Sequence, residues 1–134
     1  MSTHVRFINP ARIGKPPGYT HVVEITGPGR IVYIAGQLGI DGAGRMGADF
    51  RAQVEQAFLN LKAALDAVGA RADDVVKVNN YIVDIAKNIP AFREIRDRHL
   101  NMTSPPASTT IGVPALARDG ALFEVEAVVM LPPR

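Results

Sequence analysis

Hydrophobic residues recur every three or four positions between residues 50 and 68, with charged residues between them. This spacing predicts an amphipathic helix with one apolar stripe. Asp49 fits the N-cap of that helix and Gly69 its C-terminal stop. The stripe consists of Phe50, Val54, Ala57, Phe58, Leu61, Leu65 and Val68.

A second, shorter helix is predicted from Pro90, which suits a first helical turn, to about Asn101. Its inward stripe is expected to be Phe92, Ile95 and Leu100, and its outer residues are Arg93, Glu94, Asp97 and Arg98. Three arginines, Arg93, Arg96 and Arg98, are interpreted as a solvated face and not as an RNA-binding patch.

Segments rich in β-branched and apolar residues predict strands on both sides of these helices. They are Val5–Asn9, Thr20–Thr26, Arg30–Leu38, Val75–Ile85, Ser108–Val113 and Ala121–Leu131. Gly27-Pro28-Gly29 is a turn signal that predicts a hairpin between the second and third segments. An Asp119-Gly120 turn precedes the last strand.

The order βββαβαββ predicts an α+β fold in which each helix makes a parallel crossover between strands. One mixed sheet with two helices on one face is the simplest arrangement, and we expect one domain over residues 1–134. The strands carry apolar residues on both sides, so the uncovered face is expected to be buried against other subunits.

The composition narrows the function classes. The chain has no cysteine, which excludes disulfides and thiolate chemistry, and its start, Met1–Pro10, lacks the apolar core of a signal peptide. We therefore expect a cytoplasmic protein without membrane insertion. A net charge of +2 and few aromatic residues argue against nucleic-acid binding.

Residues Gly42–Gly47 form a G-x-G-x-x-G pattern between a predicted strand and a helix. We interpret it as a mobile loop, because the next acidic residue at a strand end, Asp84, lies much further on than the roughly 20 residues of a dinucleotide-binding fingerprint. The three histidines, His4, His21 and His99, do not have the spacing of a metal site, and no metal is expected.

Glu124 and Glu126 interrupt the apolar final strand at positions that share one face, roughly 7 Å apart. Buried carboxylates need cations, backbone donors, water or a ligand, and a raised pKa would make either one a proton carrier. Structural pairing with an arginine such as Arg118 across a subunit contact is the alternative. The hydroxyls of Ser108, Thr109 and Thr110 lack a nucleophile elbow and are read as capping or ligand-binding groups.

Five local patterns together resemble proteins of the RidA/YjgF family from end to end. They are Gly18–Tyr19, Ile34–Leu38, Val76–Tyr81, Pro106–Ile111 and Phe123–Ala127. The resemblance implies a chorismate-mutase-like fold assembled as a homotrimer, with the open sheet faces forming a central barrel and small-molecule clefts between subunits. Typical members hydrolyse reactive enamines and imines to a 2-oxo acid and ammonia without a cofactor.

The resemblance also implies the residues of the cleft. It places the attacking water on the carboxylate of Glu126 and the backbone of Gly36. The residues that bind the substrate would be Tyr19, Ala35, Tyr81, Ser108 and Thr110.

The chain departs from the family pattern at the residue after Pro106-Ala107. Active members carry an arginine there that pairs with the substrate carboxylate, whereas this chain has Ser108. Losing a charge-assisted contact of roughly 1.5–3 kcal/mol should weaken binding of 2-imino acids tenfold or more. Arg12, Lys15 or Arg118 could replace the charge, and the sequence does not decide among them.

Three functions from different classes follow from these observations. The first is an imine or enamine hydrolase with altered substrate preference. The second is a non-catalytic, metabolite-binding trimer, which the substitutions at Ala35 and Ser108 motivate. The third is an endoribonuclease that inhibits translation, for which the chain offers neither a basic stripe with aromatics nor a histidine pair.

Overall fold

The computed structural model describes residues 2–134. Its elements follow the order β1 (His4–Ile8), β2 (Val22–Thr26), β3 (Arg30–Leu38), α1 (Phe50–Ala67), β4 (Val75–Val83), α2 (Ile85–His99), β5 (Ala107–Val113) and β6 (Phe123–Leu131), with a 3₁₀ turn at Ala72–Asp74 before β4. The predicted order βββαβαββ is therefore confirmed.

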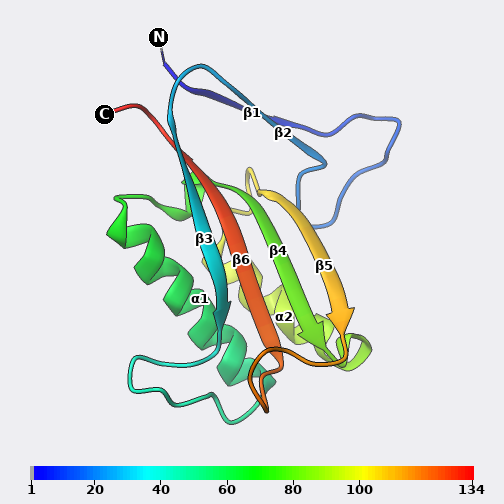
Figure 1. The fold of residues 1–134 in the computed structure, drawn as a ribbon. Helices are drawn as coiled ribbons and strands as arrows, with labels where there is room; N and C mark the ends of the chain where they lie inside the picture. Colours follow the sequence, from blue (N-terminus) through cyan, green and yellow to red (C-terminus); the bar gives the residue numbers. More distant parts are fainter. Residues whose placement is uncertain (1) are drawn as a thin grey trace.

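A four-stranded mixed sheet in the order β3-β6-β4-β5 forms the centre of the molecule. β6 runs antiparallel to both β3 and β4, whereas β4 and β5 are parallel neighbours. Both helices therefore connect parallel strands, as expected from the crossover rule. Figure 1 shows the sheet in front and both helices behind it, so that one face is covered and the other is open.

The covered face holds the hydrophobic core. Helix α1 packs against β3 and β6, and α2 packs against β4 and β5. Phe58, Val78, Phe92, Phe123 and Val125 are buried there. Because side chains alternate along a strand, the residues between them on β4 and β6 point to the open face.

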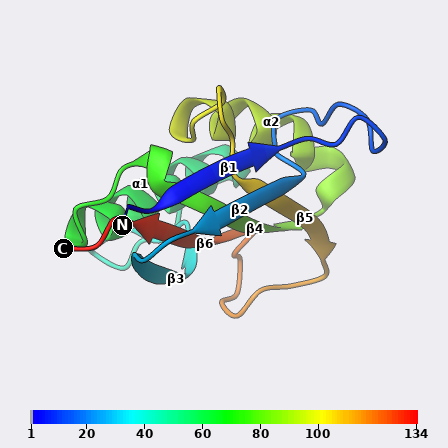
Figure 2. The ribbon, with the colours of Figure 1, turned by 90° about the horizontal axis from the view of Figure 1, so that it is seen from above.

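The hairpin predicted between β2 and β3 is wrong. β2 pairs with β1 in a separate two-stranded sheet, while β3 pairs with β6. Gly27 has a left-handed backbone (φ 89°), and the Gly27-Pro28-Gly29 segment leads the chain from β2 in the two-stranded sheet into β3 in the four-stranded sheet. In Figures 1 and 2, β1 and β2 accordingly cross one end of the sheet near both termini.

Helix α2 begins five residues before the predicted start, so that Pro90 lies inside it. The carbonyl of Asp84 accepts hydrogen bonds from the backbone of Lys87 and Asn88, which opens the helix ahead of the proline. Pro90 lies in the second turn of α2, so its missing N–H removes one backbone hydrogen bond inside the helix. Neither α1 nor α2, the α-helices of residues 2–134, has the length and apolar content needed to span a bilayer.

The glycine-containing loop before α1 is held by Asp41. Its carboxylate accepts hydrogen bonds from the backbone of Ala43 and Arg45 at 3.0 and 2.9 Å, and these bonds lower the pKa of Asp41. The first turn of α1 is capped by Asp49, whose carboxylate accepts a hydrogen bond from the backbone N–H of Ala52 at 2.8 Å. The loop is thus a turn closed by its own side chain.

Candidate functional site

Glu126 lies on the open face of the sheet between two strands that both contribute to its surroundings. Asn79 on β4 is directly opposite and donates to its carboxylate at 3.3 Å, and the hydroxyl of Tyr81 makes a short hydrogen bond to the same oxygen. This bond to a carboxylate is the main cause of the raised pKa of Tyr81, because ionised Tyr81 could not donate it. Glu126 is thereby fixed in position with two donors on one oxygen.

The strand on the other side of Glu126 carries a β-bulge. The register of β3 against β6 shifts between Ile34 and Gln37, so that Ala35 and Gly36 together face the position of Glu126. A bulge leaves its extra residue without a ladder partner, and backbone groups become available for other ligands. Gly36 also packs on the carboxylate of Glu124, where a Cβ would overlap it.

These residues form one cluster, which we call the open-face site. It comprises Ala35, Gly36, Asn79, Tyr81, Glu124 and Glu126. Within residues 2–134, neither Glu124 nor Glu126 pairs with a lysine or arginine, Arg118 included. A carboxylate held by neutral donors beside an irregular backbone can accept a proton and orient a water molecule.

A second group of predicted residues lies on the other side of the sheet. Tyr19, Ser108 and Thr110 line a small cavity of about 170 Å³ between β5 and α2, together with Pro17, Ile89, Phe92, Arg93 and Arg96. We call this cavity the edge pocket, because β5 is an edge strand. Thr20 fixes the segment of Tyr19 to the start of β5, donating from its backbone to Pro106 at 3.1 Å and from its hydroxyl to Pro105 at 2.5 Å.

Strand alternation divides the three consecutive hydroxyls of β5. Thr109 points to the open face, where its hydroxyl accepts from Lys77 at 3.0 Å. Ser108 and Thr110 point toward α2, where Asn80 donates to their hydroxyls at 3.2 and 3.1 Å. Only two of the three hydroxyls therefore reach the same pocket.

The structure thus brings the predicted residues together in two groups. Ala35, Gly36, Tyr81 and Glu126 share the open-face site, whereas Tyr19, Ser108 and Thr110 share the edge pocket on the opposite face. Within one copy the sheet separates the two groups.

Sequence reasoning missed Arg96, which lines the edge pocket, and Asn80, which lies beneath its hydroxyls. Asn80 is 1% exposed beneath the hydroxyls, and its Oδ1 has no hydrogen-bond partner within residues 2–134. Arg96 was assigned to a solvated face but is 7% exposed and lines the pocket. The signal was present in the spacing, because Arg96 follows the inward-facing Phe92 by four residues and so shares its side of the helix.

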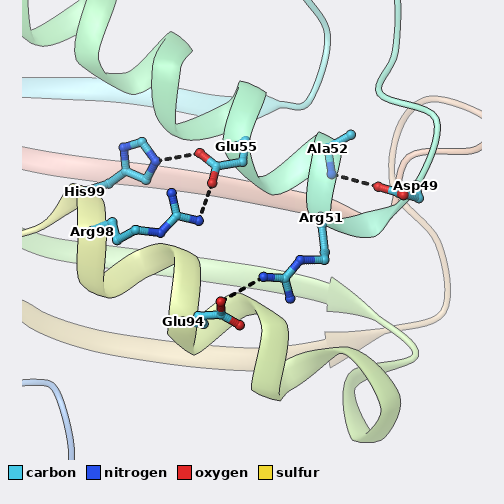
Figure 3. Close-up of polar contacts among 7 residues, drawn as sticks. All are labelled: Asp49, Arg51, Ala52, Glu55, Glu94, Arg98 and His99. Carbon is cyan, nitrogen blue, oxygen red and sulfur yellow. Dashed lines mark hydrogen bonds and ion pairs between the residues drawn. The ribbon is translucent and has the colours of Figure 1, made fainter.

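None of the histidines belongs to either group, but the ring of His21 packs edge-to-face on Tyr19 of the edge pocket, with ring centres 5.4 Å apart. His99 stacks on Phe58 and forms a hydrogen bond with Glu55 at 2.8 Å between α1 and α2, where Arg98 also reaches Glu55 (Figure 3). His21 bonds the carbonyl of Gly14 in the loop before β2. Across the described part of the chain, histidine, aspartate and glutamate side chains nowhere gather in a group of three suited to a metal ion.

Comparisons with known proteins agree with this fold and this set of motifs. A family model described as endoribonuclease L-PSP matches residues 11–131. A 2-iminobutanoate/2-iminopropanoate deaminase of Dermatophagoides farinae is 33% identical over 130 residues, which cover 94% of this chain and 96% of that protein. A RutC family protein of Aquifex aeolicus is 34% identical and covers 84% of this chain and 87% of its own length.

Solved structures give the same result. A Rid-family protein from Yersinia pestis superposes with a TM-score of 0.84 at 34% identity, covering 95% of this chain and 98% of its own. RidA from an Antarctic Psychrobacter species gives 0.72 at 34% identity over 79% of this chain and 85% of its own. The chain belongs to the RidA/YjgF family.

Proposed function

We propose that this protein hydrolyses reactive imines or enamines to a carbonyl product and ammonia without a cofactor of its own. The observation that carries the proposal is the open-face site, where Tyr81 and Asn79 hold the carboxylate of Glu126 opposite the bulge at Gly36. The relative from Dermatophagoides farinae, which is named as a 2-iminobutanoate/2-iminopropanoate deaminase, supports the same reaction class.

In this proposal a water molecule bridges the carboxylate of Glu126 and the backbone at Gly36. The water oxygen attacks the imine carbon while Glu126 takes a proton from it. Glu126 then returns that proton to the nitrogen, which gives a carbinolamine with one hydroxyl and one amino group on the same carbon. Transfer of the hydroxyl proton to the amino nitrogen, again through Glu126, lets the carbon–nitrogen bond break, so that ammonia leaves as the carbonyl forms. An enamine first takes up a proton at carbon and releases one from nitrogen to give the imine, so that water is the only co-reactant.

The two groups of residues lie on opposite faces of the sheet, so a complete cleft requires the open-face site of one copy to meet the edge pocket of another. Exposed apolar side chains support such a contact, since Ile31 and Tyr33 on the open face are 59% and 79% exposed in the single chain. We infer a homotrimer of single-domain subunits with the open faces inside and small-molecule clefts between neighbours, as the resemblance implies.

Ser108 stands where active relatives have the arginine that binds the substrate carboxylate, so we also infer an altered substrate preference. A serine hydroxyl can donate one hydrogen bond but supplies no charge. The substrate is either neutral at this end or anchored by another cation.

The test is hydrolysis of imino acids generated in situ by an amino-acid oxidase. We expect turnover by the wild type and a loss of about a hundredfold or more in Glu126→Gln, because the proton acceptor is removed. Glu94→Gln is the matched control, since Glu94 pairs with Arg51 at 3.0 Å on the exposed side of the helices and touches neither site (Figure 3).

A pair of glycine variants tests the backbone part of the site. In Gly36→Ala the new methyl group displaces the Glu124 carboxylate, which should lower kcat by about tenfold or more. In Gly42→Ala the methyl group meets nothing within 4 Å, so kcat should stay the same. Equal effects of the two substitutions would argue against a role for Gly36.

Other outcomes would favour the alternatives. Turnover that appears only in Ser108→Arg would indicate a scaffold that binds metabolites without converting them. RNA degradation by the purified wild type, lost in Glu126→Gln, would instead support the activity in the name of the family model.

A further inference from the structure

Arg96 is a buried cation at the wall of the edge pocket. Its side chain is 9% exposed and shares the pocket with Tyr19, Ser108 and Thr110. Long charged side chains are rarely buried to this extent unless they are paired or bind something. Arg96 thus places a positive charge within the same small cavity as Ser108, whose position in active relatives is occupied by an arginine.

The guanidinium of Arg96 is held in one orientation from three sides. Its Nε and Nη2 both donate to one carboxylate oxygen of Asp97, at 3.0 and 2.8 Å. Its carbon lies 5.6 Å from the centre of the Phe92 ring. The Gly18 backbone packs so closely on the guanidinium that a Cβ there would overlap Nη2. Such restraints reduce the entropy that a flexible side chain loses when it binds a ligand.

These contacts leave one edge of the guanidinium for a ligand. The guanidinium has five N–H donors, and Asp97 occupies the Nε–Nη2 edge. Nη1 has no hydrogen bond within residues 2–134 and is not sealed from solvent. The Nη1–Nη2 edge has the fork geometry that matches a carboxylate.

The charges around the pocket favour an anion. Arg93, one turn before Arg96, lines the same cavity, is exposed, and forms no ion pair within the described residues. Asp97 is the partner of Arg96 but does not line the cavity. Two guanidinium groups against one carboxylate leave the pocket with a net positive charge.

Neutral donors complete the pocket opposite Arg96. Asn80 donates to the hydroxyl oxygens of Ser108 and Thr110, so the hydrogens of both hydroxyls remain available to a ligand. A cavity of about 170 Å³ is smaller than the roughly 300–1,000 Å³ of pockets that hold drug-sized ligands. The pocket of one copy therefore has room for a small carboxylate group.

We propose that Arg96, with Arg93 beside it, is the carboxylate anchor of this protein and takes over the charge that Ser108 does not supply. The ligand class is a small 2-oxo or 2-imino acid, whose carboxylate binds Nη1 and Nη2 of Arg96 and the hydroxyls of Ser108 and Thr110. Carboxylate binding by Arg96 does not depend on the proposed function. Only the contact between the bound ligand and Glu126 of a neighbouring copy rests on it. Arg96 is a binding and specificity residue, not a proton carrier.

The test compares binding of 2-oxobutanoate with binding of its uncharged methyl ester by calorimetry. Wild type should prefer the acid, and Arg96→Gln should weaken acid binding by about tenfold to a hundredfold while leaving ester binding nearly unchanged. Arg98→Gln is the matched control, because Arg98 is on the same helix but pairs with Glu55 outside the edge pocket. Arg98→Gln should keep the wild-type preference for the acid.

A purely structural role of Arg96 would give a different pattern. Arg96→Gln would then lower the melting temperature and weaken both ligands equally, or change neither, and either result overturns the proposal. The double variant Arg96→Gln/Ser108→Arg guards against misfolding. It should recover acid binding if the pocket is intact, and failure of a folded double variant to recover it counts against the anchor.

The anchor and the hydrolase activity can fail separately. Acid-selective binding that depends on Arg96, without turnover of any imine, would retain the anchor and reject the hydrolase. Turnover that depends on Glu126 with the same KM for 2-imino acids in wild type and Arg96→Gln would retain the hydrolase and reject the anchor.

Discussion

The open-face site and the edge pocket differ in charge and in chemistry, although β4 contributes to both. The open-face site presents carboxylates with neutral donors, and within residues 2–134 no arginine or lysine pairs with them. The edge pocket presents two arginines and two hydroxyls. One arrangement can move a proton and the other can hold an anion.

The difference shows how strand alternation divides one site between two surfaces. Asn79 and Asn80 are neighbours on β4, yet Asn79 contacts Glu126 and Asn80 contacts Ser108 and Thr110 on the opposite side. A substrate anchored in the edge pocket cannot reach Glu126 of the same copy through the sheet. The separation therefore makes assembly part of the proposed chemistry.

The largest expected effect comes from disrupting that assembly. Ile31→Glu places a charge on the exposed apolar surface of β3, and burying it unpaired between subunits would be costly. We expect subunits to dissociate in sedimentation experiments and imine turnover to fall about as far as in Glu126→Gln, roughly a hundredfold or more. Leu59→Glu, at an apolar position on α1 that is also about half exposed, is the control. Full activity in a monomeric Ile31→Glu protein would refute the shared cleft.

A smaller effect is expected when the open-face site loses one donor. Tyr81→Phe removes the hydroxyl bound to Glu126, and a hydrogen bond to a charged group is worth roughly 1.5–3 kcal/mol, so kcat/KM should fall by about tenfold or more. Binding of 2-oxobutanoate in the edge pocket should not change. If only the affinity for 2-oxobutanoate fell, Tyr81 would act in ligand binding and not in the chemistry of the open-face site.

The same variant carries a prediction for alkaline pH. The Glu126 carboxylate raises the pKa of Tyr81 above its ordinary value of 10.0, so the folded protein retains this proton longer than the unfolded chain. The resulting stability is complete below pH 10 and is lost as the pH rises through the folded pKa. Denaturant titrations should show this loss in wild type and not in Tyr81→Phe.

The smallest effect is expected when the polar network of Glu55, Arg98 and His99 between the two helices is disrupted, because it lies apart from both sites. The hydrogen bond from His99 lowers the pKa of Glu55, with Arg98 adding to it (Figure 3). The stability that ionised Glu55 contributes is therefore present above pH 4.5, the ordinary pKa of a glutamate, and is lost as the pH falls through the lower pKa of Glu55 in the folded protein. Because these groups are partly exposed, Glu55→Gln should cost about 0.2–1 kcal/mol at neutral pH, measured by denaturant unfolding.

Neither kcat nor affinity should change in Glu55→Gln, which makes this variant a control for the comparison of the two sites. A change in ligand affinity would mean that the network positions α2 and, through it, Arg96.

The helix at residues 50–67 was predicted almost to the residue, because its apolar stripe, Asp49 cap and Gly69 stop are local signals that agree. Glu124 and Glu126 were also placed correctly on one face by their spacing. The pairing of β2 could not be read in this way. A Gly-Pro-Gly turn indicates a change of direction but does not say which strand offers the better partner.

The residues of the edge pocket show a similar limit. Position 96 was assigned by its charge, whereas the spacing from Phe92 placed it on the inner side of the helix. Asn80 looked like any strand residue until Ser108 and Thr110, far along the chain, were brought beside it. The spacing of residues along the chain predicts which face of a helix or strand they share. Contacts between distant segments decide what packs against that face.

The sequence by itself determined the order of elements, the two carboxylates on one strand face and the absence of an arginine at position 108, because these depend on local periodicity and residue identity. Only the tertiary structure decided that a bulge faces Glu126, that β1 pairs with β2, and that Arg96 is buried beside Ser108. Each of these depends on which distant segments pack together, and packing energy is not encoded in any single stretch of the chain.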